Sequence, residues 1–204
     1  MGSRTKKRKA PGSGPGSALR ERVDIAGVAD FFSRIASVHP DRERISFVCI
    51  GTDRSTGDSF GPWIGTMLRG QEWPSVTGTL ETPCDAERYK QAVANIPAAN
   101  TIIAIDACLG KIDPARRFLV AAGPLIPGCA TGRELPPLGH YSLAGIVGPL
   151  SVKPYWSLQR ASLYEVMGMA GEVAAAIGAA WSLPAVRASI GQQYTGMHAN
   201  QGKE

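Results

Sequence analysis

Cysteine is scarce in this chain of 204 residues, and the few cysteines that occur are dispersed. The four lie far apart and form no CxxC motif: Cys49, Cys84, Cys108 and Cys129. This spacing excludes sites that depend on a CxxC pair, and it predicts reduced, mostly buried thiols. Cys108 is kept as an alternative nucleophile, because a partner histidine would be brought to it by the fold and not by the sequence.

Long apolar runs are also missing. No segment approaches the roughly 18 consecutive apolar residues of a membrane span, and the basic start is not followed by the apolar core of a signal peptide. We therefore expect a cytoplasmic protein with no membrane partner. Hydrophobic residues still make up 44% of the chain, which is enough for one globular domain with its own core.

Acidic residues are absent from residues 1–17, which carry five basic side chains. These five account for the whole net charge of +5, so the remainder of the chain is neutral. The Gly-, Pro- and Ser-rich composition of this tail predicts disorder, and we interpret it as a solubilising arm. Nonspecific contact with nucleic acid or an anionic surface is the alternative. A single domain is expected over residues 18–184, followed by a frayed polar tail over residues 185–204.

The most informative segment is residues 45–62, ISFVCIGTDRSTGDSFGP. Its apolar start is typical of a strand buried on both faces of a parallel sheet. The Gly-, Ser- and Thr-rich loop that follows holds Asp53 and Asp58, and it lies where open α/β sheets place their ligands. Asp58 is the candidate for a functional role. The alternative is that Asp58 only caps the helix that begins near Gly61 and Pro62.

Residues 101–110, TIIAIDACLG, repeat this design, with Asp106 predicted at the carboxyl end of a second apolar strand. If the two strands are parallel neighbours, Asp58 and Asp106 meet at one edge of the sheet. Two carboxylates that lie so near to each other shift each other's pKa. One can then hold a proton while the other stays ionised, or the pair can bind a cation. Structural ion pairing is the alternative.

Strand patterns alternate with helix patterns along the chain. This predicts one α/β domain, a three-layer α/β/α sandwich with a mostly parallel central sheet. Helices are expected near residues 23–37, 61–70, 86–95 and 158–181, and further strands near residues 76–80 and 118–122. Residues 143–147 form a further apolar run, interrupted by Gly145. Residues 123–137 are dense in Gly and Pro and are expected to form a functional, lid-like loop.

Several polar residues near the first aspartate are candidates for binding a substrate. Ser55, Thr56 and Ser59 precede a helix N-terminus and could donate hydrogen bonds to an anion, although the loop lacks the GxxxxGK[ST] lysine of nucleotide sites. Arg54 is a further candidate, and its alternative role is a local ion pair with Asp53. Arg160, near the start of the expected long helix, could reach a substrate carboxylate or only face solvent.

These motifs together resemble a known family. IGTDRSTGDSFGP, IIAIDACLG, GP-x-x-PG and LQ-x-x-x-L-x-x-VM-x-MA are similar to the sporulation protein YyaC family of endospore-forming bacteria, which carries the label of a spore protease. The resemblance covers residues 45–177. It implies a relationship to the germination protease, which degrades small acid-soluble spore proteins, and a more distant one to the nickel-dependent hydrogenase maturation proteases. All of these share an α/β sandwich fold, so the resemblance implies a fold of the phosphorylase/hydrolase-like kind.

The resemblance also assigns roles to individual residues. Gly51, Asp58 and Gly61 match the glycine–aspartate loop of the germination protease, and Asp106 matches its second essential aspartate. In the hydrogenase proteases these two acidic positions bind metal together with a later histidine, which corresponds to His140. The resemblance therefore implies a divalent metal, Ni or Zn, on Asp58, Asp106 and His140. A surface imidazole or a hydrogen bond to the backbone is the alternative for His140.

Two functions follow from this reading. The first is a peptidase-like hydrolase of the sporulating cell or forespore, which cleaves a spore protein with Asp58 and Asp106 as an acid–base pair. The second is a non-catalytic protein of the spore that keeps the fold and binds metal or peptide in the acidic crevice. The resemblance names no specific substrate, and the oligomeric state stays open.

Overall fold

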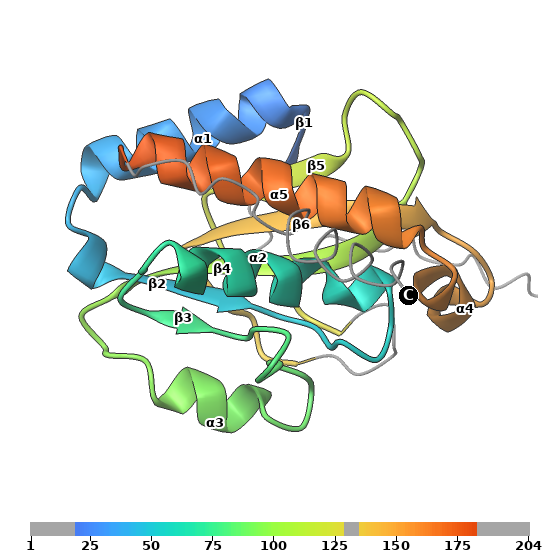
Figure 1. The fold of residues 1–204 in the computed structure, drawn as a ribbon, viewed down its shortest axis with the longest axis horizontal. Coiled ribbons are helices and arrows are strands. Elements are labelled where there is room, and N and C mark those ends of the chain that lie inside the picture. The colour runs from blue at the N-terminus through green and yellow to red at the C-terminus, as the bar shows by residue number, and fades with distance from the viewer. Residues whose placement is uncertain (1–18, 129–134, 183–204) are drawn as a thin grey trace, which may run out of the picture.

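The computed structural model describes residues 19–128 and 135–182, and Figure 1 shows their arrangement. The strands are β1 (Glu21–Val23), β2 (Ile45–Cys49), β3 (Val76–Thr77), β4 (Thr101–Gly110), β5 (Phe118–Ala121) and β6 (Tyr141–Pro149). The α-helices are α1 (Ile25–Val38), α2 (Phe60–Gly70), α3 (Tyr89–Ala94), α4 (Pro154–Gln159) and α5 (Leu163–Ala180). Two short 3₁₀ helices, η1 (Arg42–Arg44) and η2 (Gly57–Ser59), precede β2 and α2.

The strands form one six-stranded sheet in the order β1-β5-β6-β4-β2-β3. The four strands from β6 to β3 are parallel, whereas β5 and β1 extend the sheet in antiparallel fashion. Every residue of β2 is buried, as expected for a strand covered on both faces. The prediction of a mostly parallel sheet with β2 and β4 as neighbours is confirmed.

Helices cover both faces of the sheet, with α1, α2 and α5 on one side and α3 on the other (Figure 1). The larger core lies under the three long helices and includes Phe32, Phe47 and Ile177. The smaller core lies on the face of α3 and includes Val48, Tyr89 and Ala104. Alternate residues of β2 and β4 feed the two cores, because successive side chains of a strand point to opposite faces. The predicted three-layer α/β/α sandwich is confirmed.

The prediction of one long helix over residues 158–181 is wrong for its first turn. The chain forms the short helix α4, leaves helical structure at Arg160, and starts again at α5. Ser162 is the N-cap of α5, and its hydroxyl accepts a hydrogen bond from the Glu165 N–H at 3.4 Å. A serine followed three residues later by glutamate is a helix-start signal that the apolar pattern obscured. Strand β1 also went unpredicted.

Helix α5 bears on the expectation that no segment is apolar enough to span a membrane. Its 18 residues have a mean hydropathy of 1.2 and so meet the length and composition of a span. Its buried side chains, among them Met169, Val173 and Ile177, belong to the larger core. A core helix passes the same test of length and composition as a span, so this apolarity is not by itself evidence of a membrane.

The two predicted tails, residues 1–17 and 185–204, lie outside the described residues. The predicted loop over residues 123–137 is described in part, without residues 129–134. Within its described part, Leu125 and Leu138 exchange backbone hydrogen bonds, at 3.0 and 2.9 Å. This bridge brings the two described ends of the loop together beside β4.

Candidate functional site

A pocket of about 660 Å³ opens where β2 ends and the loop to α2 begins. Its wall carries four acidic residues, Asp58, Asp85, Glu87 and Asp106, and two arginines, Arg20 and Arg54. We call it the acid pocket. Much of the remaining wall is apolar and includes Ile50, Leu109, Leu119, Leu125, Leu135 and Leu150. The two aspartates that the sequence pairs are therefore brought together in one wall.

Contacts of the main chain hold Asp58 at this pocket. Gly51, directly after β2, has a φ of 140°, and a Cβ at this position would collide with the Asp58 carbonyl oxygen. The Thr52 N–H donates to that same oxygen at 3.2 Å. At Gly61, a Cβ would collide with the carbonyl oxygen of Ile50. The loop is thus clamped against the end of β2, and only glycine fits at the two contact points.

Asp58 does not cap helix α2. The residue lies in η2, and the N-cap position of α2 is occupied by Ser59, which makes no capping hydrogen bond with its side chain. The interpretation of Asp58 as a helix cap is therefore wrong. Its side chain is half-buried in the pocket wall instead.

Asp106 lies inside β4 and not at its end, which corrects the sequence prediction. Strand β4 continues to Gly110 because β6 pairs with it along this stretch. On the other side, β2 pairs with β4 only as far as the Cys49–Ile105 pair. Asp106 is thus the first residue of β4 beyond the end of β2. This step between neighbouring strands puts its half-buried side chain in the same pocket as Asp58.

Burial raises the pKa of both carboxyls, and Asp106 is affected more strongly. Its pKa rises to about 8, mainly because of burial. The Ala107 N–H, which donates to Asp106 Oδ1 at 2.8 Å, lowers this pKa, the charge of Asp58 raises it, and Arg20 lowers it. Burial also raises the pKa of Asp58, against the opposing effect of the nearby Ser55 hydroxyl. At neutral pH, Asp106 is therefore the protonated member of the pair.

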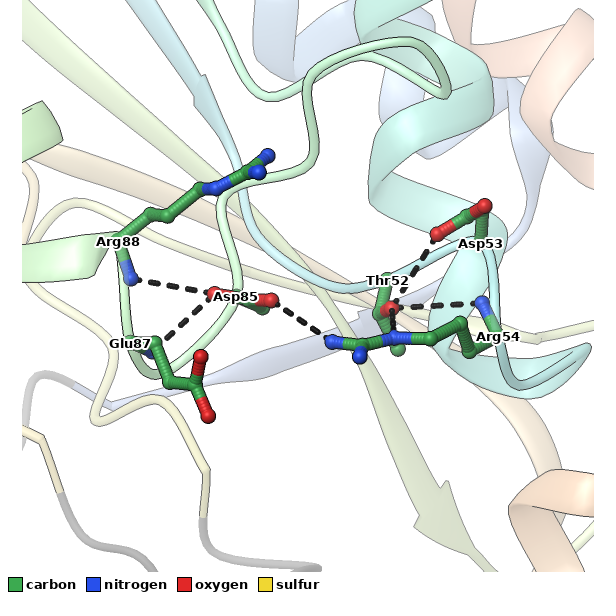
Figure 2. Close-up of polar contacts among 6 residues, drawn as sticks. All are labelled: Thr52, Asp53, Arg54, Asp85, Glu87 and Arg88. Atoms are coloured by element: carbon green, nitrogen blue, oxygen red, sulfur yellow. Dashed lines mark hydrogen bonds and ion pairs between the residues drawn. The ribbon is translucent and has the colours of Figure 1, made fainter.

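Arg54 joins the wall of the acid pocket through the polar network drawn in Figure 2. Its Nη2 lies 3.0 Å from Asp85 Oδ2, and its Nε donates to Thr52 Oγ1 at 3.3 Å. The other oxygen of Asp85 accepts the N–H groups of Glu87 and Arg88, both at 3.1 Å. The Asp85 carboxylate thus fixes the turn before α3 and links that turn to the loop after β2.

The expected ion pair between Asp53 and Arg54 is wrong. Asp53 instead accepts a long hydrogen bond, 3.5 Å, from Thr52 Oγ1, and Arg54 pairs with Asp85, 31 residues away (Figure 2). The Arg54 side chain is 72% exposed, so this pair contributes little to stability. Its effect is to fix the Arg54 guanidinium against Asp85 in the wall of the acid pocket.

The hydroxyls predicted to bind substrate do not line the acid pocket. Ser59 is buried and donates to the Thr56 carbonyl at 2.6 Å. Ser55 is also buried, and its Oγ has no hydrogen-bond partner among the described residues, although it lies near enough to Asp58 to favour the charged carboxylate. Of the predicted binding residues, only Arg54 contributes to the described wall. The pattern failed because the turn that includes η2 leaves Ser55 and Ser59 buried in the protein interior.

His140 does not join the two aspartates. Its imidazole Nδ1 accepts a hydrogen bond from the Ile102 backbone N–H at 2.9 Å, and the backbone N–H of His140 donates to the Ile102 carbonyl at 2.8 Å. Ile102 is at the amino end of β4, whereas Asp106 lies toward the carboxyl end. Within the described part of the chain, no group of three His, Cys, Asp or Glu side chains could hold a metal ion. The predicted ligand trio is therefore not formed, and the backbone-bonded imidazole is confirmed.

The cysteine thiols near the acid pocket are held protonated. Cys108 lines the pocket, and burial, followed by the charge of Asp106, raises its pKa to about 12. Burial likewise raises the pKa of Cys84 to about 12, and Cys49 shifts in the same direction. A protonated thiol is a poor nucleophile, so Cys108 does not fit the role of a catalytic cysteine. Cys49, Cys84 and Cys108 are all free, as the sequence predicts.

Three charged residues of the acid pocket were not predicted from the sequence. Asp85 and Glu87 precede α3, and an aspartate just before a helical pattern is a signal that could have been used. Arg20 lies next to β1, a strand that was also missed, and nothing in the local sequence marks it. Its position depends on the pairing of β1 with β5 at the sheet edge.

Comparison with known proteins identifies the family of this chain. A family model described as "Protein of unknown function (DUF1256)" matches residues 20–176. The chain is 39% identical over 135 residues to the "Uncharacterized protein YyaC" of Bacillus subtilis (strain 168). The chain belongs to the YyaC family. The match spans 64% of this chain and 66% of the Bacillus subtilis YyaC protein, just under two thirds of its length. No solved structure matches the chain significantly.

Proposed function

We propose that this YyaC-family protein is a peptidase-like hydrolase that uses Asp58 and Asp106 as its acid–base pair. The observation that carries the proposal is the placement of two half-buried carboxyls in the wall of one pocket. Burial raises both pKa values, and that of Asp106 more strongly; a difference between two neighbouring carboxyls is the arrangement that separates an acid from a base.

The protonation states assign the two roles. Because Asp106 holds the proton, Asp58 is the base, and it takes a proton from water as the water oxygen attacks the peptide carbonyl carbon. Asp106 gives its proton to the leaving amine as the C–N bond breaks. The products are a carboxylic acid and a free amine. Asp106 then regains a proton as Asp58 releases one, so the cycle closes without an external reactant.

Features of the pocket wall support a polypeptide substrate. Apolar side chains such as Leu119 and Leu125 line it beside the two carboxyls, and they suit the side chains of a peptide. Arg54 and Asp85 add a fixed donor and acceptor at the mouth. We further propose that the substrate is a spore protein in the cytoplasm of the sporulating cell or forespore. This part rests on the resemblance of the aspartate motifs to the germination protease.

The test is cleavage of proteins extracted from sporulating cells, followed by mass spectrometry of new termini. Asp58→Asn and Asp106→Asn should each lower the cleavage rate about 100-fold or more, which is the usual loss on removing a general acid or base. Asp53→Asn is the matched control, since this neighbouring exposed aspartate is outside the described pocket wall and should retain full activity.

The pH profile gives a second test of the roles. Activity should fall on the alkaline side as pH passes about 8, because Asp106 loses the proton it must donate. An intact protein that cleaves nothing across the pH range and with any divalent metal added contradicts the proposal. Binding of peptide or metal without cleavage would instead indicate the non-catalytic alternative.

A further inference from the structure

A second pocket, of about 600 Å³, is lined by α4, the start of α5, the chain before β5, the end of β6 and the chain that follows it. Three cationic side chains line it, Arg117, Lys153 and Arg160, with the single carboxylate Glu165. We call it the basic pocket. Three hydroxyls and an apolar floor complete its wall: Ser151, Ser157, Ser162, Ile112, Pro114, Val147, Pro149, Trp156 and Ala161.

Two of the three cations are free to meet a ligand. Arg117 is already engaged, since its Nη1 lies 3.0 Å from Glu165 Oε2 and its Nη2 donates to the Ile146 carbonyl at 3.3 Å. This pair neutralises the carboxylate of the pocket. The side chains of Lys153 and Arg160 make no ion pair or hydrogen bond with any described residue. The pocket therefore keeps two uncompensated positive charges.

The backbone that presents these charges is fixed. Ser151 Oγ and Ser157 Oγ are 2.8 Å apart, and Ser151 Oγ also accepts the Lys153 N–H at 3.2 Å. The Arg160 N–H donates to the Trp156 carbonyl at 3.1 Å. The indole of Trp156 stays 59% exposed and offers an apolar surface beside the charges. A site with this composition favours an anion attached to an apolar body.

We propose that the basic pocket binds a small organic anion, a carboxylate or phosphate on an apolar body, held by Lys153 and Arg160 and packed against Trp156. The volume of the pocket is in the range of small-molecule sites. This site is separate from the acid pocket, since the two described walls have no residue in common. The proposal does not depend on the proposed hydrolase activity.

The test is calorimetric titration of the full chain with phenyl phosphate and with benzoate, each at low and moderate salt. Saturable one-to-one binding of at least one of them is expected, and the better ligand distinguishes a phosphate from a carboxylate. Inorganic phosphate should bind about ten-fold more weakly than phenyl phosphate, because it lacks the apolar body. Benzyl alcohol, which has that body without the charge, should not bind measurably.

Two variants locate the site. Lys153→Gln combined with Arg160→Gln should weaken binding about ten-fold or more, since each removes a charge-assisted hydrogen bond. Trp156→Ala should bring the affinity for phenyl phosphate close to that for inorganic phosphate. The control is Arg69→Gln combined with Lys90→Gln, which removes the same charge from exposed helical positions outside both pockets. All three proteins are checked for the wild-type melting temperature.

Three results would overturn the proposal. The first is the absence of saturable binding by both aromatic anions in the wild type. The second is an equal loss of binding in the Arg69/Lys90 control, which would mean that only net charge matters. The third is unchanged affinity in the folded Lys153/Arg160 variant, which would place the anion elsewhere on the protein.

Discussion

The acid pocket and the basic pocket share one segment of chain, residues 149–157, but they are constructed differently. Leu150, Pro154 and Tyr155 of this segment line the acid pocket, while Ser151, Lys153 and Trp156 line the basic one. In the acid pocket, close backbone contacts at glycines set the positions of half-buried carboxyls. In the basic pocket, exposed side chains supply the free charge.

This difference separates two ways of making a polar site. A carboxyl that must change its protonation state has to be partly desolvated, so the chain around it has to be packed tightly. A cation that only attracts an anion keeps its charge in water and needs a fixed backbone but no burial. We expect the acid pocket to be sensitive to changes in the packing around its carboxyls and the basic pocket to tolerate such changes.

The largest effect is expected from Gly61→Ala at the clamp of the acid pocket. The new Cβ would meet the backbone of Ile50, which cannot yield without separating α2 from β2. We expect a loss of about 3 kcal/mol in the free energy of unfolding, measured by urea denaturation. Gly168→Ala is the control, since Gly168 is an exposed position of α5 with open space around a new Cβ. The free energy of unfolding of this variant should rise by about zero to 1 kcal/mol.

If Gly61→Ala is as stable as the wild type, the loop is not clamped by this contact. The comparison between the two pockets would then fail at its starting point. A Gly61→Ala protein that retains the affinity of the basic pocket for phenyl phosphate, while its acid pocket loses activity, would sharpen the comparison.

An effect of similar size is expected in the pH dependence of stability. The pKa of Asp106 is about 8 in the folded protein and near 3.8 when exposed, so the folded protein retains a proton that the unfolded chain releases. The free energy of unfolding should therefore fall as pH rises from about 4 to about 8, and then level off. Asp106→Asn lacks this dependence, so its stability relative to the wild type should grow by a few kcal/mol over that range.

Denaturation curves at half-unit steps of pH measure this difference. In Asp58→Asn, the pH at which the fall in stability levels off should be lower than in the wild type, because the charge of Asp58 helps to raise the pKa of Asp106. Wild-type and Asp106→Asn curves that run parallel from pH 4 to pH 9 would show that Asp106 titrates like an exposed carboxyl.

The smallest effect is expected from Ser162→Ala in the basic pocket. This change removes the N-cap of α5 and leaves the Glu165 N–H without its acceptor. We expect a cost of about 1 kcal/mol in thermal unfolding. Ser37→Ala is the control, because the exposed Ser37 hydroxyl near the end of α1 donates only to a carbonyl three residues earlier. This substitution should change the free energy of unfolding by no more than about 0.5 kcal/mol. A Ser162→Ala protein with the stability of the wild type contradicts the assigned cap.

The sheet and the pairing of Asp58 with Asp106 could be predicted because both depend on local patterns. Apolar runs identify β2 and β4, and neighbouring parallel strands align their carboxyl ends. The continuation of β4 beyond Asp106 could not be predicted, because it depends on its pairing with β6, a strand that starts 35 residues later. Asp106 still reaches the pocket, since β2 ends before it.

The error at His140 has a different cause. Spacing along the chain matched a ligand position, but His140 lies just before β6, a strand parallel to β4. A residue before a strand is at the amino edge of a parallel sheet, opposite the edge where Asp106 lies. The direction of β6, which the structure supplies, excludes the trio. The inward rotation of Ser55 and Ser59 depends on the η2 turn, which has no clear sequence signal.

The glycine clamp at Gly51 and Gly61 has a consequence for how this family can diversify. Because main-chain atoms of Ile50 and Asp58 form its contacts, the path of the loop does not depend on which side chains face the pocket. Residues such as Thr52, Arg54 and Asp58 can then be exchanged over evolutionary time without rebuilding the scaffold. One rigid backbone can carry different chemistries in this way, and the function of a relative has to be judged from its pocket side chains and not from its fold.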